Sequence, residues 1–162
     1  MTDAGILRLA RKLGRLCKAR GIMVATAESC TGGGVAEAIT AIAGSSEWFD
    51  RGFVTYSNAA KQDLLGVSIA TLRKYGAVSE EVAREMAAGA LAASRAQSSV
   101  AVTGIAGPGG GSVEKPVGTV WFAWASGDGV IHSERHRFKG GRAAVRGRSV
   151  QVALEGLIEQ VG

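Results

Sequence analysis

Cysteine and proline are scarce in this sequence, with two of each among 162 residues. Cys17 and Cys30 are neither a close pair nor spaced like metal ligands, which excludes a disulfide framework and a cysteine metal site. We therefore expect a reduced chain located in the cytoplasm. No apolar run is long enough to cross a bilayer and no signal peptide heads the sequence, so we expect neither a membrane protein nor a secreted one.

Histidine is equally rare, which narrows the kinds of catalysis available. His132 and His136 fall at alternate positions of one late predicted strand, and no acidic residue is placed to orient either ring. The residues around Ser29 also differ from the G-x-S-x-G pattern, because Ala27 and Thr31 stand where that pattern has glycine. A Ser-His-Asp hydrolase is therefore disfavoured.

Basic residues outnumber acidic ones by 19 to 14, which gives a net charge of +5. Such a balance suits an anionic small molecule and also suits nucleic acid. Six basic residues lie in the first predicted helix: Arg8, Arg11, Lys12, Arg15, Lys18 and Arg20. No aromatic residue is interleaved with them, and no nucleic-acid-binding motif accompanies them. We interpret them as the solvated face of an amphipathic helix and expect no nucleic-acid partner.

The length and the hydrophobic pattern predict one globular α/β domain over residues 1–162. Strands are expected over residues 22–26, 48–56, 99–103, 118–125 and 130–138. Helices are expected over residues 3–20, 35–43, 59–65, 69–74, after Ser79, and over 142–159. The early alternation of helices and strands implies parallel strands with crossover helices, and the final hairpin adds antiparallel pairing. We expect a mixed sheet between two helix layers.

Ligands of such folds bind at the carboxyl ends of the parallel strands. Three predicted strands end in polar residues, namely Glu28-Ser29, Tyr56-Ser57-Asn58 and Thr103-Gly104. A glycine-rich turn and a helical pattern follow Ser29, so its hydroxyl is expected at a helix N-terminus with unpaired N–H donors. Ser29 is either a nucleophile beside its own oxyanion hole or, like Thr31, a cap for that helix.

Lys61 is the best candidate for a base that activates Ser29. It lies one helical turn beyond the second strand end, in a helix for which Asn58 is the expected N-cap. Burial and the positive end of a helix both lower the pKa of a lysine, whereas an exposed Lys61 would stay protonated. Tyr56 is either a proton relay or a packed strand-end aromatic. Ser57 is a rival nucleophile, because it precedes Lys61 by four residues.

Two later segments have the composition of ligand-binding loops. The glycine-rich stretch over residues 104–112 lacks the Lys-Ser/Thr ending of a P-loop, so it is either a backbone cradle or a hairpin connection. Arg142 and Arg146 lie one turn apart after Gly140-Gly141, and they either hold a phosphate or are solvated.

Several motifs occur in a family-specific order. They are Thr26-Ala27-Glu28-Ser29-Cys30-Thr31-Gly32-Gly33, Gly44-Ser45-Ser46, Val54-Thr55-Tyr56-Ser57-Asn58-Ala59-Ala60-Lys61, Leu65-Gly66-Val67, Gly76-Ala77-Val78-Ser79, Thr103-Gly104-Ile105-Ala106-Gly107-Pro108 and Lys115-Pro116-Val117-Gly118-Thr119. Together they resemble the CinA C-terminal domain family, the nicotinamide-nucleotide amidases of PncC type. The resemblance covers nearly the whole chain.

The resemblance implies a three-layer α/β/α sandwich whose mixed, mostly parallel sheet has five strands, one of them antiparallel. It implies hydrolysis of nicotinamide mononucleotide to nicotinate mononucleotide and ammonia, in pyridine nucleotide salvage, without a metal or cofactor. It makes Ser29 the nucleophile, Lys61 the general base and Tyr56 an assisting hydroxyl. The remaining residues expected to bind substrate are Glu28, Thr31, Gly32, Gly33, Thr103, Gly104 and Arg142, with backbone N–H groups of residues 31–33 holding the oxyanion and Arg142 at the phosphate.

A rival hypothesis is a non-catalytic nucleotide-binding or competence-associated module with the same fold. Retention of Ser29, Tyr56 and Lys61 argues against it, because a relic would be free to lose them. We expect a homodimer, because closed two-fold assemblies are the commonest oligomers of compact subunits.

Overall fold

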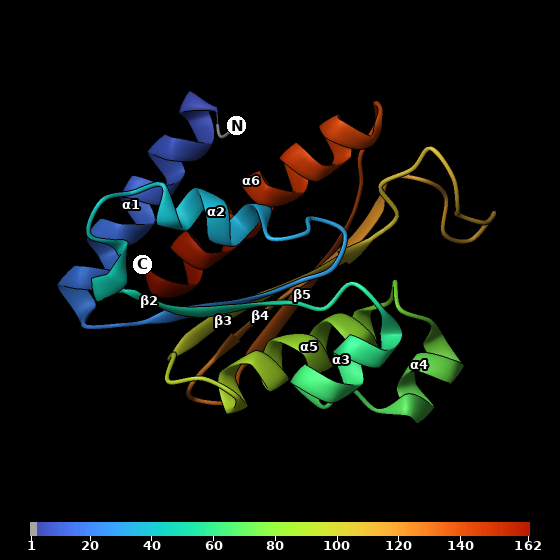
Figure 1. Ribbon diagram of the computed structural model, residues 1–162, viewed down its shortest axis with the longest axis horizontal. Coiled ribbons are helices and arrows are strands. Elements are labelled where there is room, and N and C mark those ends of the chain that lie inside the picture. Colours follow the sequence, from blue (N-terminus) through green and yellow to red (C-terminus); the bar gives the residue numbers. More distant parts are fainter. Residues whose placement is uncertain (1–2) are drawn as a thin grey trace.

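A five-stranded sheet lies between two layers of helices in the computed structural model, which describes residues 3–162 (Figure 1). One face of the sheet carries α1 (Ala4–Arg20), α2 (Gly34–Thr40) and α6 (Arg142–Val161). The other face carries α3 (Asn58–Leu65), α4 (Ile69–Tyr75) and α5 (Glu80–Ala92). The predicted three-layer α/β/α fold class is therefore confirmed.

The sheet has the strand order β2-β1-β3-β4-β5. Its strands are β1 (Val24–Glu28), β2 (Phe49–Val54), β3 (Ser98–Gly104), β4 (Thr119–Ser126) and β5 (Ile131–Arg137). β1 pairs in parallel with β2 and β3, whereas β4 pairs antiparallel with β3 and β5. Only β4 runs against the other strands, as expected. Four of the five strands therefore run in one direction, which agrees with the expected mostly parallel sheet. Of the four pairings between neighbouring strands, however, two are parallel and two are antiparallel.

Serine side chains cap the N-termini of α3 and α5, two helices next to the predicted site. Ser79 caps α5 as its position suggests, since its Oγ accepts from the Val82 N–H at 3.2 Å. The predicted cap of α3 is wrong by one residue: the Ser57 Oγ accepts from the Ala60 N–H at 3.0 Å. Asn58 is already helical, so its side chain is not in the capping position.

Two element boundaries also differ from the expected ones. β1 begins at Val24 rather than at Ile22, because Gly21 ends α1 in the left-handed region with φ 64°. The Ile22 N–H then donates to the Cys17 carbonyl at 2.9 Å and does not pair in the sheet. α2 ends at Thr40 rather than near residue 43, and a turn leads into the 3₁₀ helix η1 (Ser45–Glu47).

The two faces of the sheet are packed with side chains of different size. The face under α1, α2 and α6 is filled by large side chains that include Trp48, Phe122, Trp124 and Leu154. The face under α5 is rich in alanine, including Ala27, Ala83, Ala87, Ala101 and Ala123. Small residues let α5 approach the strands closely, and the Ser99 Oγ donates to the Ala87 carbonyl at 2.7 Å. The predicted site lies at the carboxyl edge of this alanine-rich face.

A β-bulge interrupts β2 near its start. Val24 pairs with Phe49, but the next residue of β1 pairs with Arg51, so Asp50 is the extra residue. Phe49 consequently packs on the side of α1 and α2, whereas Phe53 packs on the side of α5. In a regular strand without a bulge, residues four apart such as Phe49 and Phe53 would face the same way, because strand side chains alternate.

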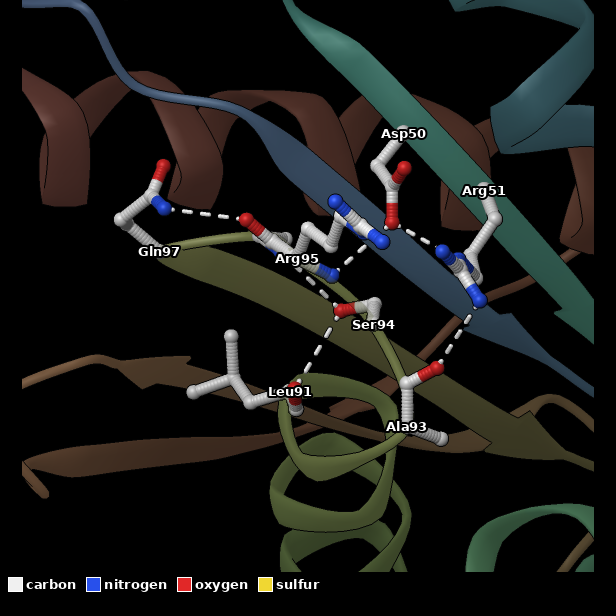
Figure 2. A network of polar contacts seen from close by, with 8 residues as sticks. Asp50, Arg51, Leu91, Ala93, Ser94, Arg95 and Gln97 are labelled. Carbon is white, nitrogen blue, oxygen red and sulfur yellow. Dashed lines mark hydrogen bonds and ion pairs between the residues drawn. The ribbon is translucent and has the colours of Figure 1, made fainter.

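The bulge is held by a polar network at the amino ends of the strands (Figure 2). The Asp50 carboxylate accepts from Arg51 Nε at 2.7 Å and from the Arg95 N–H at 3.0 Å. These two bonds, the Arg95 amide first, lower the pKa of Asp50. Arg51 also donates to the Ala93 carbonyl at 3.2 Å, so the network ties β2 to the segment between α5 and β3.

Two glycines of α6 have opposite surroundings and give a paired test of this packing. A Cβ at Gly156 would overlap the indole of Trp124, which is buried and donates to the Ala153 carbonyl at 3.1 Å. We expect Gly156→Ala to lower the free energy of unfolding by about 1–3 kcal/mol. Gly147→Ala places its methyl in open space and should raise that free energy by up to about 1 kcal/mol. Urea unfolding of both variants measures the difference, and equal effects would contradict the described contact.

Candidate active site

The carboxyl ends of β1, β2 and β3 meet at one edge of the sheet, as the sequence predicted. Alternation along β1 sends neighbouring side chains to opposite faces, so Glu28 reaches α2 while Ser29 lies on the side of α3 and α5. Thr103 lies on that side too, and its Oγ1 donates to the Ala77 carbonyl at 2.9 Å. Gly104 ends β3, where a Cβ would come within 2.7 Å of Val120 Cγ2. Ser29 and Thr103 therefore lie on the same side of this edge, and Gly104 has no room for a side chain toward β4.

Lys61 and Ser29 are in direct contact. Lys61 lies in the first turn of α3, its side chain is buried with 1% exposure, and its Nζ is 3.0 Å from the Ser29 Oγ. The same Nζ lies 2.8 Å from the Thr55 carbonyl and 3.3 Å from the Tyr56 carbonyl. A neutral amine has two hydrogens and one lone pair. The two carbonyls can take both hydrogens, which leaves the lone pair to accept the proton of the Ser29 hydroxyl.

The surroundings of Lys61 favour its neutral form. Burial lowers the pKa of the Lys61 amine from its ordinary value, and the nearby Cys30 thiol opposes this shift. None of the ion pairs found within residues 3–162 includes Lys61, so no carboxylate compensates for the lost hydration of an ammonium. The position in the first turn of a helix acts in the same direction as burial.

A pocket of about 190 Å³ opens beside this pair. It is lined by Ser29, Cys30, Tyr56, Lys61, Ala77, Val78, Thr103, Gly104, Ala106 and Arg142. Six of the residues predicted for the site are thus brought together. The other four, Glu28, Thr31, Gly32 and Gly33, lie outside its lining.

Arg142 connects three segments at the mouth of the pocket. Its guanidinium donates to the Tyr56 hydroxyl at 3.3 Å and to the Gly107 carbonyl at 2.8 Å. Tyr56 is 62% exposed, so its ring does not pack in the core, and it is the Tyr56 carbonyl rather than the hydroxyl that touches Lys61. The hydroxyl and the guanidinium together form a polar rim over the pocket.

Glu28 organises the turn after β1 rather than the pocket. Its buried carboxylate accepts from the Thr31 Oγ1 at 2.6 Å, from the Val35 N–H at 2.9 Å and from the Ala36 N–H at 3.1 Å. Two expectations from the sequence, the cap of α2 and the contact of Glu28 with substrate, are therefore wrong. Neither Ser29 nor Thr31 caps α2, because Glu28 accepts from its first N–H groups. For the same reason Glu28 presents no free carboxylate to a ligand.

Arg146 is a second organiser of this turn, and the sequence reasoning missed its role. Its Nε donates to the Cys30 carbonyl at 3.1 Å and its second terminal nitrogen donates to the Thr31 carbonyl at 3.2 Å. Arg146 does not line the pocket, whereas Arg142 does. Every residue has a backbone carbonyl, so a sequence does not show which carbonyl a side chain binds. The spacing of Arg142 and Arg146 therefore suggested only a shared phosphate.

The N–H groups expected to hold an oxyanion are not equally free. The Gly32 N–H already donates to the Ser29 carbonyl at 3.0 Å. In contrast, within residues 3–162 we find no acceptor for the N–H groups of Cys30, Thr31 and Gly33, and of these residues Cys30 and Thr31 are buried. Of the three N–H groups expected to hold the oxyanion, only that of Gly32 is therefore already engaged, and Cys30, which lines the pocket, is a further candidate donor.

The remaining candidates lie elsewhere. Ser57 is exposed and its hydroxyl caps α3, so it is not the serine that faces Lys61. His132 and His136 are on β5, which β3 and β4 separate from β1. His132 has a 69% exposed side chain, and His136 stacks on Phe138.

A larger open depression of about 490 Å³ lies between α1 and α6. Four of the basic residues of α1 line it, namely Arg8, Arg11, Lys12 and Arg15. It contains no buried nucleophile. In the part of the chain that the structure describes, three or more His, Cys, Asp or Glu side chains do not gather anywhere as a metal site would require. No helix over residues 3–162 has the length and apolar character needed to cross a membrane.

The fold and the buried Ser29–Lys61 pair define a three-layer α/β protein with a serine–lysine site at the carboxyl edge of its sheet. The CinA C-terminal domain model matches residues 6–161, and the chain belongs to this family. Nicotinamide-nucleotide amidohydrolase PncC of Escherichia coli K12 is 56% identical over 160 residues, which cover 99% of this chain and 97% of that protein. The protein of the same name from Pseudomonas putida is 54% identical, over 95% of this chain and 96% of its own length.

Other relatives carry different descriptions. The CinA-like protein of Syntrophobacter fumaroxidans is 51% identical over 90% of this chain, which corresponds to 34% of that longer protein. Among solved structures, the competence/damage inducible protein CihA from Agrobacterium tumefaciens superposes with a TM-score of 0.96 at 52% identity. That match covers 98% of this chain and 97% of the other chain.

Removing the charge of Glu28 tests its role in the turn. We expect Glu28→Gln to lower the free energy of unfolding by about 1–3 kcal/mol, because one of two carboxylate acceptors becomes an amide donor facing N–H groups. Glu37→Gln, at an exposed position of α2, should change that free energy by less than about 0.5 kcal/mol. Urea unfolding measures both, and a Glu28→Gln variant as stable as Glu37→Gln would refute the described anchoring.

Proposed function

We propose that this chain is an amidase that hydrolyses the carboxamide of nicotinamide mononucleotide to nicotinate mononucleotide and ammonia, as a step of pyridine nucleotide salvage. The observation that carries the proposal is the buried Lys61 Nζ at 3.0 Å from the Ser29 Oγ, in a pocket at the strand edge. The names of the relatives that share 54–56% of their residues support the substrate.

Acylation is the first half of the proposed reaction. The Ser29 Oγ forms a bond to the carboxamide carbon while its proton passes to the neutral Lys61 amine. The electron pair of the carbonyl bond moves onto the oxygen, which the N–H groups of Thr31 and Cys30 then hold. When this intermediate collapses, the carbon–nitrogen bond breaks and Lys61 returns its proton to the departing nitrogen. Ammonia leaves, and an ester links the substrate to Ser29.

Hydrolysis of this ester completes the cycle. A water molecule attacks the ester carbon and gives one proton to Lys61. The bond to Ser29 then breaks, and its oxygen takes the proton back from Lys61. The sum is one amide and one water converted to one carboxylic acid and one ammonia, with both residues regenerated.

The pocket suits the pyridine ring that carries the carboxamide better than it suits the whole nucleotide. Its volume of about 190 Å³ is below the roughly 300–1,000 Å³ of pockets that enclose drug-sized ligands, so the ribose and phosphate extend past its mouth. Arg142 lies at this mouth, and its fork suits a phosphate. Tyr56 accompanies Arg142 there and assists through its hydroxyl, while Thr103 and Gly104 line the wall beside Ser29.

Ammonia release from nicotinamide mononucleotide tests the function directly. We expect Ser29→Ala and Lys61→Arg each to reduce kcat by at least about 10³-fold, since one lacks the nucleophile and the other stays protonated. Lys12→Arg, an exposed substitution of the same kind, should retain the parent rate. Binding of the mononucleotide by the parent chain without ammonia release would favour the non-catalytic module instead.

The pH dependence of kcat/KM tests the state of Lys61. Catalysis needs the neutral amine, so activity should fall as the pH drops through the lowered pKa of Lys61 and stay level above it. The midpoint of this acidic limb should therefore lie below the ordinary lysine value of 10.5. Initial rates from about pH 5 to about pH 11 measure it. A limb that rises only near 10.5 would show that Lys61 is an ordinary, solvated lysine.

A further inference from the structure

We propose that Arg146 is a positioning residue that fixes the turn after Ser29 so that the Thr31 N–H faces the reacting carbonyl. The inference rests on the proposed function, because it assigns a task within that reaction. Both side-chain hydrogen bonds of Arg146 go to backbone carbonyls of this turn, so it acts through the backbone and not on the substrate.

The guanidinium of Arg146 donates hydrogen bonds to two successive peptide groups. Its Nε and a terminal nitrogen donate to the carbonyls of Cys30 and Thr31 at 3.1 Å and 3.2 Å. A planar guanidinium presents these donors in a fixed fork, so it sets the orientation of both peptides at once. The turn also packs against it, since a Cβ at Gly32 would lie 3.4 Å from the same terminal nitrogen.

Peptide geometry carries this orientation to the other side of the turn. In a trans peptide the carbonyl and the following N–H point in opposite directions. The Thr31 carbonyl points at Arg146, and the N–H of the same peptide, on Gly32, points back to the Ser29 carbonyl at 3.0 Å. By the same rule the Cys30 carbonyl, held by Arg146, turns the Thr31 N–H away from the guanidinium.

The Thr31 N–H is a donor that is free to bind a ligand. Thr31 is 1% exposed, and over residues 3–162 its N–H finds no acceptor. Buried amides without a partner are rare, so such a group is expected to meet an acceptor that arrives with the substrate. The charge on Arg146 also polarises the peptide that it holds, which strengthens the N–H as a donor.

The turn needs an external hold because of its composition. Gly32 and Gly33 have φ values of 60° and 104°, and glycine gains the most freedom when its surroundings loosen. Glu28 fixes the side of the turn that enters α2. Arg146 fixes the side that carries Thr31, and no other side chain over residues 3–162 donates to these two carbonyls.

The test compares Arg146→Met with Arg148→Met, an exposed arginine of the same helix without side-chain hydrogen bonds in the described chain. If Arg146 aligns the oxyanion donor, Arg146→Met should lower kcat by about 10- to 100-fold with KM changed less than about twofold. The acidic limb of the pH profile should stay in place, because the Ser29–Lys61 contact is untouched. Arg148→Met should match the parent, and Arg146→Lys should be intermediate, because one ammonium lacks the fork.

A second readout follows the turn itself and does not depend on activity. Cys30 is buried, which raises the pKa of its thiol to about 11, so it reacts slowly with a thiol reagent while the turn is closed. The charge of Arg146 lowers that pKa, so its removal alone would slow the reaction. Faster labelling of Cys30 in Arg146→Met therefore reports opening, and Cys17, on the buried face of α1, is the reference in the same sample.

The outcomes separate the two proposals. Faster labelling of Cys30 alone, together with a lower kcat, supports the role of Arg146. Labelling and kcat equal to those of Arg148→Met would overturn it, and so would equal acceleration at Cys17 and Cys30, which indicates general destabilisation. A parent chain that releases no ammonia would refute the proposed function, while labelling would still show whether Arg146 holds the turn.

Discussion

The burial of one amine is the constraint on which the rest of the site depends. The Lys61 Nζ lies within 3.3 Å of three oxygen atoms and is shielded from water. An ammonium in this place would lose its hydration and gain no carboxylate in return, so the environment favours the neutral amine. Two of the three oxygens are backbone carbonyls at the end of β2, which means that the course of the main chain, more than any single side chain, prepares Lys61 for Ser29.

Charged residues around Ser29 divide into two kinds. Lys61 is kept without an ionic partner, while Glu28 and Arg146 satisfy backbone groups on opposite sides of the same turn. Each of the latter two bonds to two successive peptide groups, so the glycine-rich turn is held by side chains that come from β1 and α6. The turn can therefore keep the left-handed glycines that its tight path requires without becoming loose.

Much of this arrangement could be predicted from the sequence because it follows from strand order and alternation. Ser29, Tyr56 and Thr103 lie at or just beyond the carboxyl ends of β1, β2 and β3, and these ends share one edge of the sheet, so their proximity needed no side-chain detail. The sequence could not reveal which polar group meets which backbone group. Glu28 was expected to face substrate and instead anchors α2, and Asn58 was expected to cap α3 in place of Ser57. Arg146 was expected to bind a phosphate or to be solvated, and its role in the turn was missed for the same reason, since its partners are carbonyls that every residue has.

The bulge at Asp50 has a consequence for how the length of this chain can change over generations. It sets which residues of β2 face α5, and therefore where the Thr55 and Tyr56 carbonyls stand when the chain reaches Lys61. Loss or gain of one residue between Asp50 and Thr55 would exchange the two faces and remove those carbonyls from the amine. The exposed loop over residues 109–114 is not part of a strand, so a change in its length does not exchange the faces of the sheet. Descendants of this sequence are free to lengthen or shorten that loop, but a change of one residue in β2 has to be absorbed by a bulge, as Asp50 is.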